Sequence, residues 1–433
     1  MHQAYQPVEE PEEREYDPIE VRRSFRFLSM DVIFYICGLA FLDPSTVVPS
    51  FLATLTNSTI IIGAITALRP AGIFLPQLWT AHHLRNRVCH KSFMMGVASV
   101  SRIAISLFAI VLLIAHPGSR VLMGMAFVMM YVAFWCSEGV AGVPWTDLMA
   151  KSIPERLRGR LFGLTQFGGG ILALLAGLVI SRMLSPGGPA YPANSAILMV
   201  LGAVFFWISY VSLSAVREPS GIPEGGDSGF FEYLSGVGRM LAEHAQFKRL
   251  MGVQLLLGVY GMALPFYILY AKQTVGISGT MVGVLLSVEM AGSILISATV
   301  GYMSDHLGPR WAIMVSGVSG ILAPLIVLFV PVKSFWLYVP VFFMVGGMTG
   351  ALWIGLTNFL LELAEPNERR SYIGIMNTAG APTLAFPFIG GLIAHVFSYR
   401  AVFAVTAAAL GIGLILALGL HTREGNPASD AQD

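Results

Sequence analysis

Charged residues are scarce in this chain of 433 residues. Asp, Glu, Lys and Arg together make up 12% of the sequence, whereas hydrophobic residues make up 55%. Soluble domains usually carry about a quarter charged residues, so the composition excludes an ordinary soluble protein. The formal net charge is +1, and the sequence contains no basic block of the kind that binds nucleic acid. We therefore expect a lipid bilayer as surroundings and no nucleic-acid partner.

Cysteines and catalytic motifs are also rare. Cys37 and Cys136 fall in apolar segments and Cys89 in a polar one, so the sequence offers no pair for a disulfide outside a membrane. Three histidines lie near Cys89, but their spacing matches no familiar zinc pattern. We find no nucleotide-binding loop, nucleophile elbow or metalloprotease helix. We accordingly expect no enzyme, no cofactor and no metal.

Long apolar segments, in contrast, recur from residue 28 to residue 420. A helix needs about 20 predominantly apolar residues to cross the hydrocarbon core of a bilayer, and each segment is about that long. The sequence therefore predicts an all-α membrane protein with twelve spans, at 28–50, 59–80, 93–115, 119–143, 162–183, 194–216, 249–270, 279–302, 311–332, 335–358, 372–395 and 399–420.

The basic residues predict the orientation of these spans. Most of the 26 Lys and Arg residues fall in segments on the same side as the N-terminus. The opposite side carries only Arg120, Arg182, Lys272, Lys333 and Arg400. Cytoplasmic loops of membrane proteins are enriched in Lys and Arg. We therefore expect both termini in the cytoplasm and the chain in the inner, or plasma, membrane.

One loop carries a family signature. The stretch Gly301-Tyr-Met-Ser-Asp305-His-Leu-Gly308-Pro-Arg310 joins the spans at 279–302 and 311–332. It resembles the G-x-x-x-D-x-x-G-[RP]-[RK] loop of the major facilitator superfamily of transporters. A weak internal repeat agrees with this resemblance, because Pro154-Glu-Arg follows the fourth span and Pro366-Asn-Glu-Arg follows the tenth. In the first half the same loop departs from the pattern, with His82 where Asp305 stands.

The resemblance implies two pseudo-symmetric six-helix bundles and rocker-switch alternating access for a small organic solute, with protons as a second candidate cargo. It also implies a monomer. The chain would then divide into an N-terminal segment, a first half, a linker with an amphipathic helix, a second half and a tail, at 1–27, 28–216, 217–248, 249–420 and 421–433. An uncoupled facilitator or an efflux pump are alternatives. A transporter-like sensor or assembly factor is an alternative of another class.

Charges inside the predicted spans are the main functional clue, because each costs roughly 2.5–3.5 kcal/mol on insertion scales. We place five there: Asp43, Arg69, Arg102, Glu138 and Glu289. Glu289 is the only one of these five charges in a span of the second half. Desolvation favours its neutral form, so it is the first candidate for a proton switch, and a substrate contact or a structural role stay open. Asp43 and Glu138 are further candidates. Arg69 suits a ligand or a structural role, and Arg102 suits a structural partner of Glu138 or Asp43.

Further site residues follow from the resemblance. Spans 1, 4, 7 and 10 line the central path in this superfamily, which predicts a substrate cavity formed by Tyr35, Trp135, Gln254, Tyr260, Tyr267, Trp353 and Thr357. Charges at the cytoplasmic ends suggest a gate of ion pairs. Its candidates are Asp305, Arg310, Glu362 and Arg370 in the second half, and Asp147 with Arg158 in the first. The alternative is that these charges only set the topology.

The predicted topology can be tested with reporter fusions. A reporter fused after Arg217, and another after residue 421, should both report a cytoplasmic location, because an even number of spans precedes each point. A fusion within 184–193, between the fifth and sixth predicted spans, serves as the control and should report the outer side. A periplasmic signal from either of the first two fusions would contradict the topology.

Overall fold

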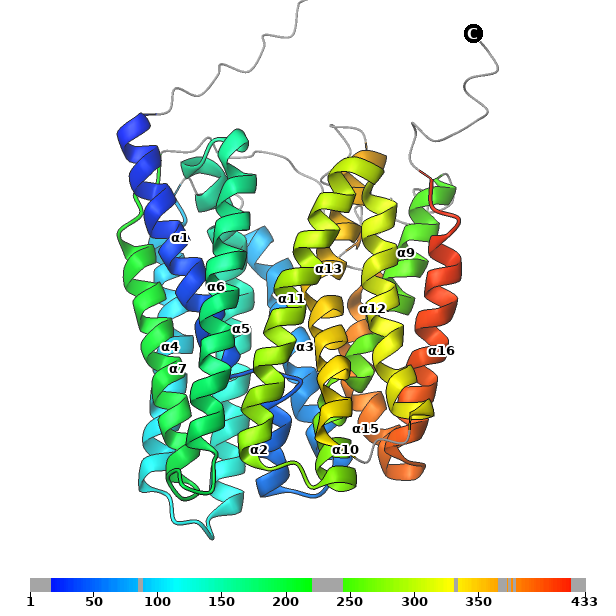
Figure 1. Ribbon diagram of the computed structural model, residues 1–433. Helices are drawn as coiled ribbons and strands as arrows, with labels where there is room; N and C mark the ends of the chain where they lie inside the picture. Colours follow the sequence, from blue (N-terminus) through cyan, green and yellow to red (C-terminus); the bar gives the residue numbers. More distant parts are fainter. Residues whose placement is uncertain are drawn as a thin grey trace, which may run out of the picture.

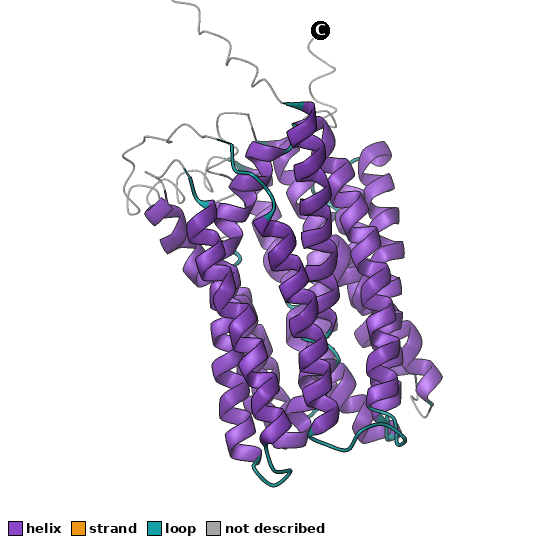
Figure 2. Ribbon diagram, turned by 90° about the vertical axis from the view of Figure 1, so that its left-hand side faces the viewer, coloured by secondary structure: helices purple, strands orange, loops and turns teal. Residues whose placement is uncertain are grey.

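The computed structural model describes residues 17–84, 89–219, 244–330, 334–364, 372, 375–376 and 379–421. The predicted N-terminal segment up to residue 16, the linker helix and the tail from residue 422 lie outside these ranges. Every regular element in them is a helix (Figure 2), which confirms the predicted all-α class. The α-helices are α1 (Pro18–Ala40), α2 (Val47–Leu55), α3 (Thr59–Leu84), α4 (Lys91–Ile114), α5 (Arg120–Ser152), α6 (Glu155–Met183), α7 (Ala193–Ser214), α9 (Ala245–Gly258), α10 (Tyr260–Val275), α11 (Gly279–Leu307), α12 (Pro309–Phe329), α13 (Tyr338–Leu363), α15 (Phe386–Val396) and α16 (Tyr399–Ala417). Two short 3₁₀ helices are η1 (Phe335–Leu337) and η2 (Ala381–Ala385).

Within the described residues, ten helical stretches are long and apolar enough to cross a membrane. The structure differs from twelve uninterrupted spans at three places. The segment predicted at 28–50 is broken between α1 and α2, around Pro44. The segment at 249–270 divides into α9 and α10, which meet at Val259. In the segment at 372–395, the described residues include helical positions at 372, 375–376 and 379, followed by η2 and the short helix α15. A hydropathy window averages over such breaks and so cannot detect them.

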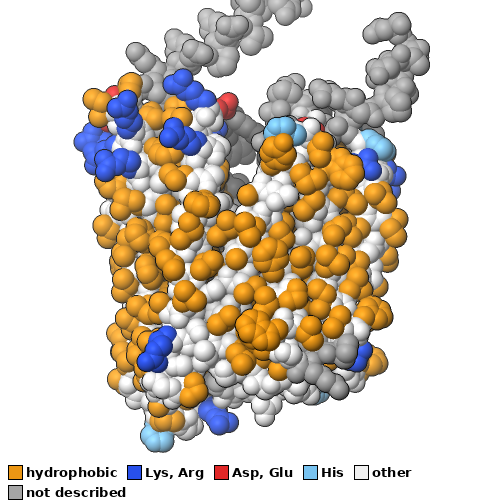
Figure 3. All heavy atoms as spheres, in the orientation of Figure 1, with side chains coloured by type: hydrophobic (Ala, Val, Ile, Leu, Met, Phe, Trp, Pro, Cys, Tyr) orange, Lys and Arg blue, Asp and Glu red, His pale blue; other side chains and the backbone are white. Residues whose placement is uncertain are grey.

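The surface also agrees with a membrane environment. Hydrophobic side chains cover the middle of the molecule, and Lys and Arg gather mainly at one end (Figure 3). Large apolar residues on the outer helices are well exposed, among them Ile114, Val211 and Phe329. In water such exposure would be costly, whereas lipid tails solvate these side chains.

The helices pack in a regular order (Figure 1). α1 packs on α6 and α7, α4 packs on α5 and α7, and α3 packs on α5. In the later part of the chain, α13 packs on α11 and α12, and α16 packs on α9 and α12. The two groups touch mainly along two seams, α6 with α11 and α3 with α15, and α2 also contacts α10.

Both seams are closest near one end of the molecule. α1 begins and α16 ends at the same face, at the top of Figure 1, which we call the terminal face. The close approaches lie toward the opposite face, where Ser287 Oγ of α11 donates to Leu174 O of α6 at 2.8 Å. Thr59 Oγ1 of α3 donates to Gly391 O of α15 at 3.0 Å in the second seam. The two groups of helices are therefore held together at the face opposite the termini.

Glycines make this approach close. A Cβ added to Gly283 of α11 would overlap Ser181 N and Gly177 O of α6. The backbones can touch because Gly177 and Gly283 have no side chain, and small residues are common where membrane helices meet.

We therefore predict that Gly283→Ala lowers the thermal stability of the purified protein, because the added methyl group must push α6 and α11 apart. The matched control is Gly301→Ala on the same helix, where a Cβ meets nothing within 4 Å. Ala is favoured over Gly in helix interiors by about 1 kcal/mol, so the control should be unchanged or slightly more stable. Equal melting temperatures for the two variants would show that the seam does not depend on the glycine.

Candidate functional site

A central cavity of about 460 Å³ lies between the two groups of helices. Its wall comes from α1, α3 and α5 on one side and from α9, α10, α11 and α13 on the other, with η2 and the residues between α1 and α2 completing it. Most of the lining is apolar. Three charged side chains, Asp43, Arg69 and Glu289, line it among the described residues. Such a mixture of apolar walls and a few polar groups is typical of a binding site for a small organic molecule.

Asp43 lies in the break between α1 and α2. Its Oδ1 accepts hydrogen bonds from Ser45 N at 2.9 Å and Ser45 Oγ at 2.7 Å. The same oxygen accepts from Thr46 N at 2.8 Å and Thr46 Oγ1 at 2.7 Å. The side chain thus satisfies backbone N–H groups just before α2 begins at Val47, where a helix N-terminus favours negative charge. All four groups around this oxygen are donors.

Glu289 comes from α11 and is 2% exposed. Its Oε2 lies at hydrogen-bond distance from Ser45 Oγ, which also contacts Asp43. A serine hydroxyl has only one hydrogen to donate. Two ionised carboxylates would therefore compete for that hydrogen, and one of them would be left facing a lone pair. The row Asp43–Ser45–Glu289 is fully hydrogen-bonded only when one of the two carboxyl groups carries a proton.

Arg69 of α3 faces the same cavity. Its Cζ lies 4.8 Å from the centroid of a Trp135 ring, a cation–π contact with α5. Among the residues that the structure describes, no carboxylate lies within ion-pair distance of Arg69. Trp135 Nε1 is buried and makes no hydrogen bond of good geometry. Gln254 Nε2 donates to Met376 O at 3.1 Å, whereas its Oε1 is buried without a partner.

The cavity thus brings together seven of the residues that the sequence suggested for it: Asp43, Arg69, Trp135, Gln254, Tyr260, Glu289 and Trp353. Four others lie outside its lining. Tyr267 is buried and stacked on Phe403, with ring centroids 4.9 Å apart. Tyr35 packs edge-on against Phe206, and Thr357 Oγ1 is buried without a partner.

Glu138 is the fourth of these. It forms an ion pair with Arg102, which is 3% exposed, and Ser101 Oγ donates to the same carboxylate oxygen at 2.6 Å. The pair joins α4 to α5 inside one group of helices. The charge of Glu138 is therefore neutralised by Arg102, because the Glu138 side chain on α5 faces α4 rather than the cavity.

The predicted gate is only partly described. The side chain of Asp305 and all of Arg370 lie outside the described residues, Arg310 is half-buried and Glu362 is exposed. In this conformation Asp147 and Arg158 do not pair with each other. Arg158 instead donates to Ala150 O and Ile153 O at the end of α5, at 2.9 and 3.1 Å. Those carbonyls are nearer because α6 begins two residues after Ile153.

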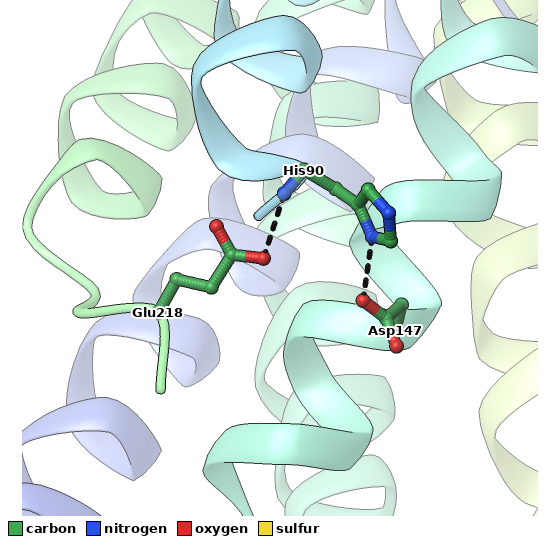
Figure 4. Close-up of side chains that lie close together, drawn as sticks. All are labelled: His90, Asp147 and Glu218. Atoms are coloured by element: carbon green, nitrogen blue, oxygen red, sulfur yellow. Dashed lines mark hydrogen bonds and ion pairs between the residues drawn. The ribbon is translucent and has the colours of Figure 1, made fainter. Parts of the chain in front are cut away.

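Asp147 belongs to a different cluster at the terminal face (Figure 4). Its Oδ2 lies 2.8 Å from His90 Nδ1 and contacts Lys151 Nζ at 2.5 Å. The two carboxylate oxygens of Glu218 accept from His90 N at 2.8 Å and Lys91 N at 2.9 Å, at the start of α4. Ligand atoms of His90, Asp147 and Glu218 lie within 4.8 Å of one another and are of metal-binding types. Lys151 Nζ, 3.7 Å from Glu218, already supplies a positive charge there. The cluster therefore ties α4, α5 and the residues after α7 together.

Two buried polar residues escaped the sequence analysis. Asp31 accepts from Trp145 Nε1 at 2.9 Å and from Ser209 Oγ at 2.6 Å, which joins α1 to α5 and α7. The sequence did contain a signal for Asp31, because an acidic residue within a predicted span (28–50) usually has a polar partner. Ser45 was also missed, although Asp43-Pro-Ser-Thr is a sequence typical of turns and helix starts.

Comparison with known proteins gives one family and one fold. Residues 250–432 match the sequence model of the Major Facilitator Superfamily. The crystal structure of the nucleoside transporter NupG, as a D323A mutant, superposes with a TM-score of 0.68 at 14% identity, over 92% of this chain and 100% of that one. The superfamily transporter FucP in the outward conformation gives a TM-score of 0.60 at 12% identity, over 93% and 100%. No curated protein matches the sequence. Identities this low establish the fold alone.

We predict that Glu218→Ala lowers the stability of the protein by about 1–3 kcal/mol, because two partly buried N–H groups at the start of α4 lose a charged hydrogen-bond acceptor. Thermal unfolding of the purified protein would measure this as a lower melting temperature. Glu155→Ala is the control, since Glu155 is 88% exposed and its contact with Arg158 is 3.5 Å long. A Glu218 variant as stable as the control would show that the cluster contributes nothing to the fold.

Proposed function

We propose that this chain, whose residues 250–432 match the Major Facilitator Superfamily model and which has the fold of solved transporters, is a secondary transporter that moves a small organic solute by rocker-switch alternating access. The cavity supports this proposal, since helices from early and late parts of the chain line it together. Charged side chains in its wall favour transport over a sensor or assembly factor, for which a sealed and fully apolar centre would be expected. Proteins of this family transport rather than catalyse.

The proposed arrangement has twelve crossings in two halves, at 28–216 and 249–420. In it α1 with α2 forms the first crossing, α9 with α10 the seventh, and the residues up to the end of α15 the eleventh. Broken helices are common at transporter binding sites, and all three breaks have residues in the cavity wall. We place both termini in the cytoplasm and the protein in the plasma, or inner, membrane as a monomer.

With that orientation, the described conformation faces inward. The seams α6–α11 and α3–α15 hold the outer face shut, and Lys272 Nζ adds a long contact to Ser50 O at 3.4 Å between α10 and α2. Alternating access would open these seams and close the terminal face. The short polar contacts and glycine approaches in the seams suit a surface that must separate and re-form.

The row Asp43–Ser45–Glu289 carries the proposal of proton coupling. Asp43 Oδ1 is already surrounded by donors, so the extra proton belongs on Glu289, which then donates to Ser45 while Ser45 donates to Asp43. Ser45 comes from the first half and Glu289 from the second. Loss of the proton leaves two acceptors for one hydrogen, which weakens the contact between the halves. Protonation thereby shifts the balance between conformations, as coupling requires. Asp43, Arg69 and Tyr260 are the titratable groups that share the cavity with Glu289.

Two alternatives within transport remain distinct in their predictions. An uncoupled facilitator would move its solute without any proton flux. An efflux pump would run the same cycle with the opposite net direction. Solute-dependent proton flux in proteoliposomes separates the coupled mechanism from the facilitator, with solutes taken from a thermal-shift screen of metabolites and drugs.

We predict that Glu289→Gln abolishes accumulation driven by a pH gradient but retains solute exchange, because the neutral amide resembles the protonated acid in shape and can still donate to Ser45. Ser45→Ala should reduce the same accumulation at least tenfold, since it removes the link to Asp43. The control is Ser50→Ala on α2, whose hydroxyl is buried without a partner and whose loss should leave coupling unchanged. Normal accumulation by Glu289→Gln would show that this residue has no role in coupling.

A further inference from the structure

We propose that the transported solute is an organic anion, and that Arg69 binds its carboxylate while the apolar wall of the cavity holds a body of one or two rings or a medium aliphatic chain. This inference rests on the proposed function, of which it names the substrate class. Three charged side chains line the cavity, and they differ in whether they have a hydrogen-bond or ion-pair partner in the protein.

Of the three charged side chains in the cavity wall, Arg69 is the one without a hydrogen-bond or ion-pair partner among the described residues. Asp43 accepts four hydrogen bonds at the start of α2, and Glu289 is hydrogen-bonded to Ser45. The Arg69 guanidinium, in contrast, has no carboxylate at ion-pair distance in the described part of the chain. Arg69 is half-buried in the cavity wall, and even a partly desolvated cation is destabilised unless it is paired. A solute that brings its own negative charge removes this cost on binding.

The geometry around Arg69 suits a carboxylate. A guanidinium is planar and offers paired N–H donors that match the two oxygens of a carboxylate. The Trp135 ring lies 4.8 Å from Arg69 Cζ and supports the guanidinium from α5. Trp135 Nε1 is a further donor; it is buried and makes no hydrogen bond of good geometry, although it interacts with the Tyr131 hydroxyl. This part of the cavity therefore has more donors than acceptors, as an anion site should.

Apart from the Tyr260 hydroxyl and the unpartnered Gln254 Oε1, the rest of the lining offers few free groups to a solute rich in hydroxyl groups. The three threonines of the wall all donate to carbonyls of their own helical segments: Thr66 to Ile62 O, Thr349 to Val345 O and Thr383 to Gly380 O. Aliphatic and aromatic residues make up most of the remaining wall, including Phe74, Met290 and the half-exposed Trp353. A volume of about 460 Å³ accommodates a small ring system or a medium chain.

Charge balance fits the proposed proton at Glu289. One proton and one carboxylate together carry no net charge, so entry of the pair leaves the total charge of the cavity unchanged. Transport of an anion with a proton would then be electrically silent, whereas a neutral solute with a proton would move one positive charge.

The test is thermal stabilisation of the full-length purified chain in carboxylate-free buffer by matched pairs of probes. The pairs are benzoate with benzamide, phenylacetate with phenylacetamide and hexanoate with hexanamide, and adenosine and uridine serve as neutral polar probes. At least one carboxylate should raise the melting temperature while its amide does not. Arg69→Gln should weaken that apparent affinity at least tenfold, and Arg69→Lys less. Arg182→Gln, on α6 and outside the cavity lining, should leave it unchanged.

A second variant keeps the inference testable if the Arg69 variants do not fold. Trp135→Phe keeps an aromatic ring beside Arg69 but removes the Nε1 donor, and should weaken carboxylate binding several-fold. Stabilisation by a nucleoside and by no carboxylate would overturn the inference, as would a carboxylate effect that Arg69→Gln leaves intact or a panel in which nothing binds. Proton flux driven by a neutral solute would sink this inference alone and leave the proposed transport function standing.

Discussion

The Ser45 hydroxyl has one hydrogen and lies between two buried carboxyl groups, and the rest of the site depends on this constraint. Asp43 is fixed by backbone and hydroxyl donors at the start of α2, so any change in protonation falls on Glu289. Because Ser45 and Glu289 are 244 residues apart in sequence, their contact joins distant helices across the cavity. In the proposed mechanism, a single proton alters both the charge of the cavity and the contact between its walls.

The surroundings of this row fit such a switch. Toward the face opposite the termini, α6 and α11 approach closely where glycines and serines meet, and Ile294 packs on Gly170. Packing of that kind holds helices together by close backbone contact and few hydrogen bonds. The strongly paired charges lie elsewhere, with Arg102 and Glu138 inside one group of helices and His90, Asp147 and Glu218 at the terminal face. Each group can thus stay rigid while the contact between the groups changes.

The sequence predicted the apolar helices well, because length and hydropathy are local properties. The segment predicted at 194–216, for example, is α7 at Ala193–Ser214. The same windows passed over the break at Pro44, although its turn residues were visible. Which polar residues meet depends on packing between distant segments. The sequence listed Asp43, Arg69 and Glu289 as isolated charges, but it could not show that Ser45 links two of them, that Arg69 lies over Trp135, or that α5 directs Glu138 away from the cavity.

Infrared difference spectroscopy tests the central claim most directly, because a protonated carboxyl group has a carbonyl band that a carboxylate lacks. Spectra of the purified protein, recorded between acidic and alkaline pH, should contain one such band that Glu289→Gln removes and Ser45→Ala shifts. The account predicts that this band persists in Glu138→Gln. A band unchanged in Glu289→Gln, or a wild-type spectrum in which Glu289 stays ionised at every pH, would contradict a proton held in the row Asp43–Ser45–Glu289.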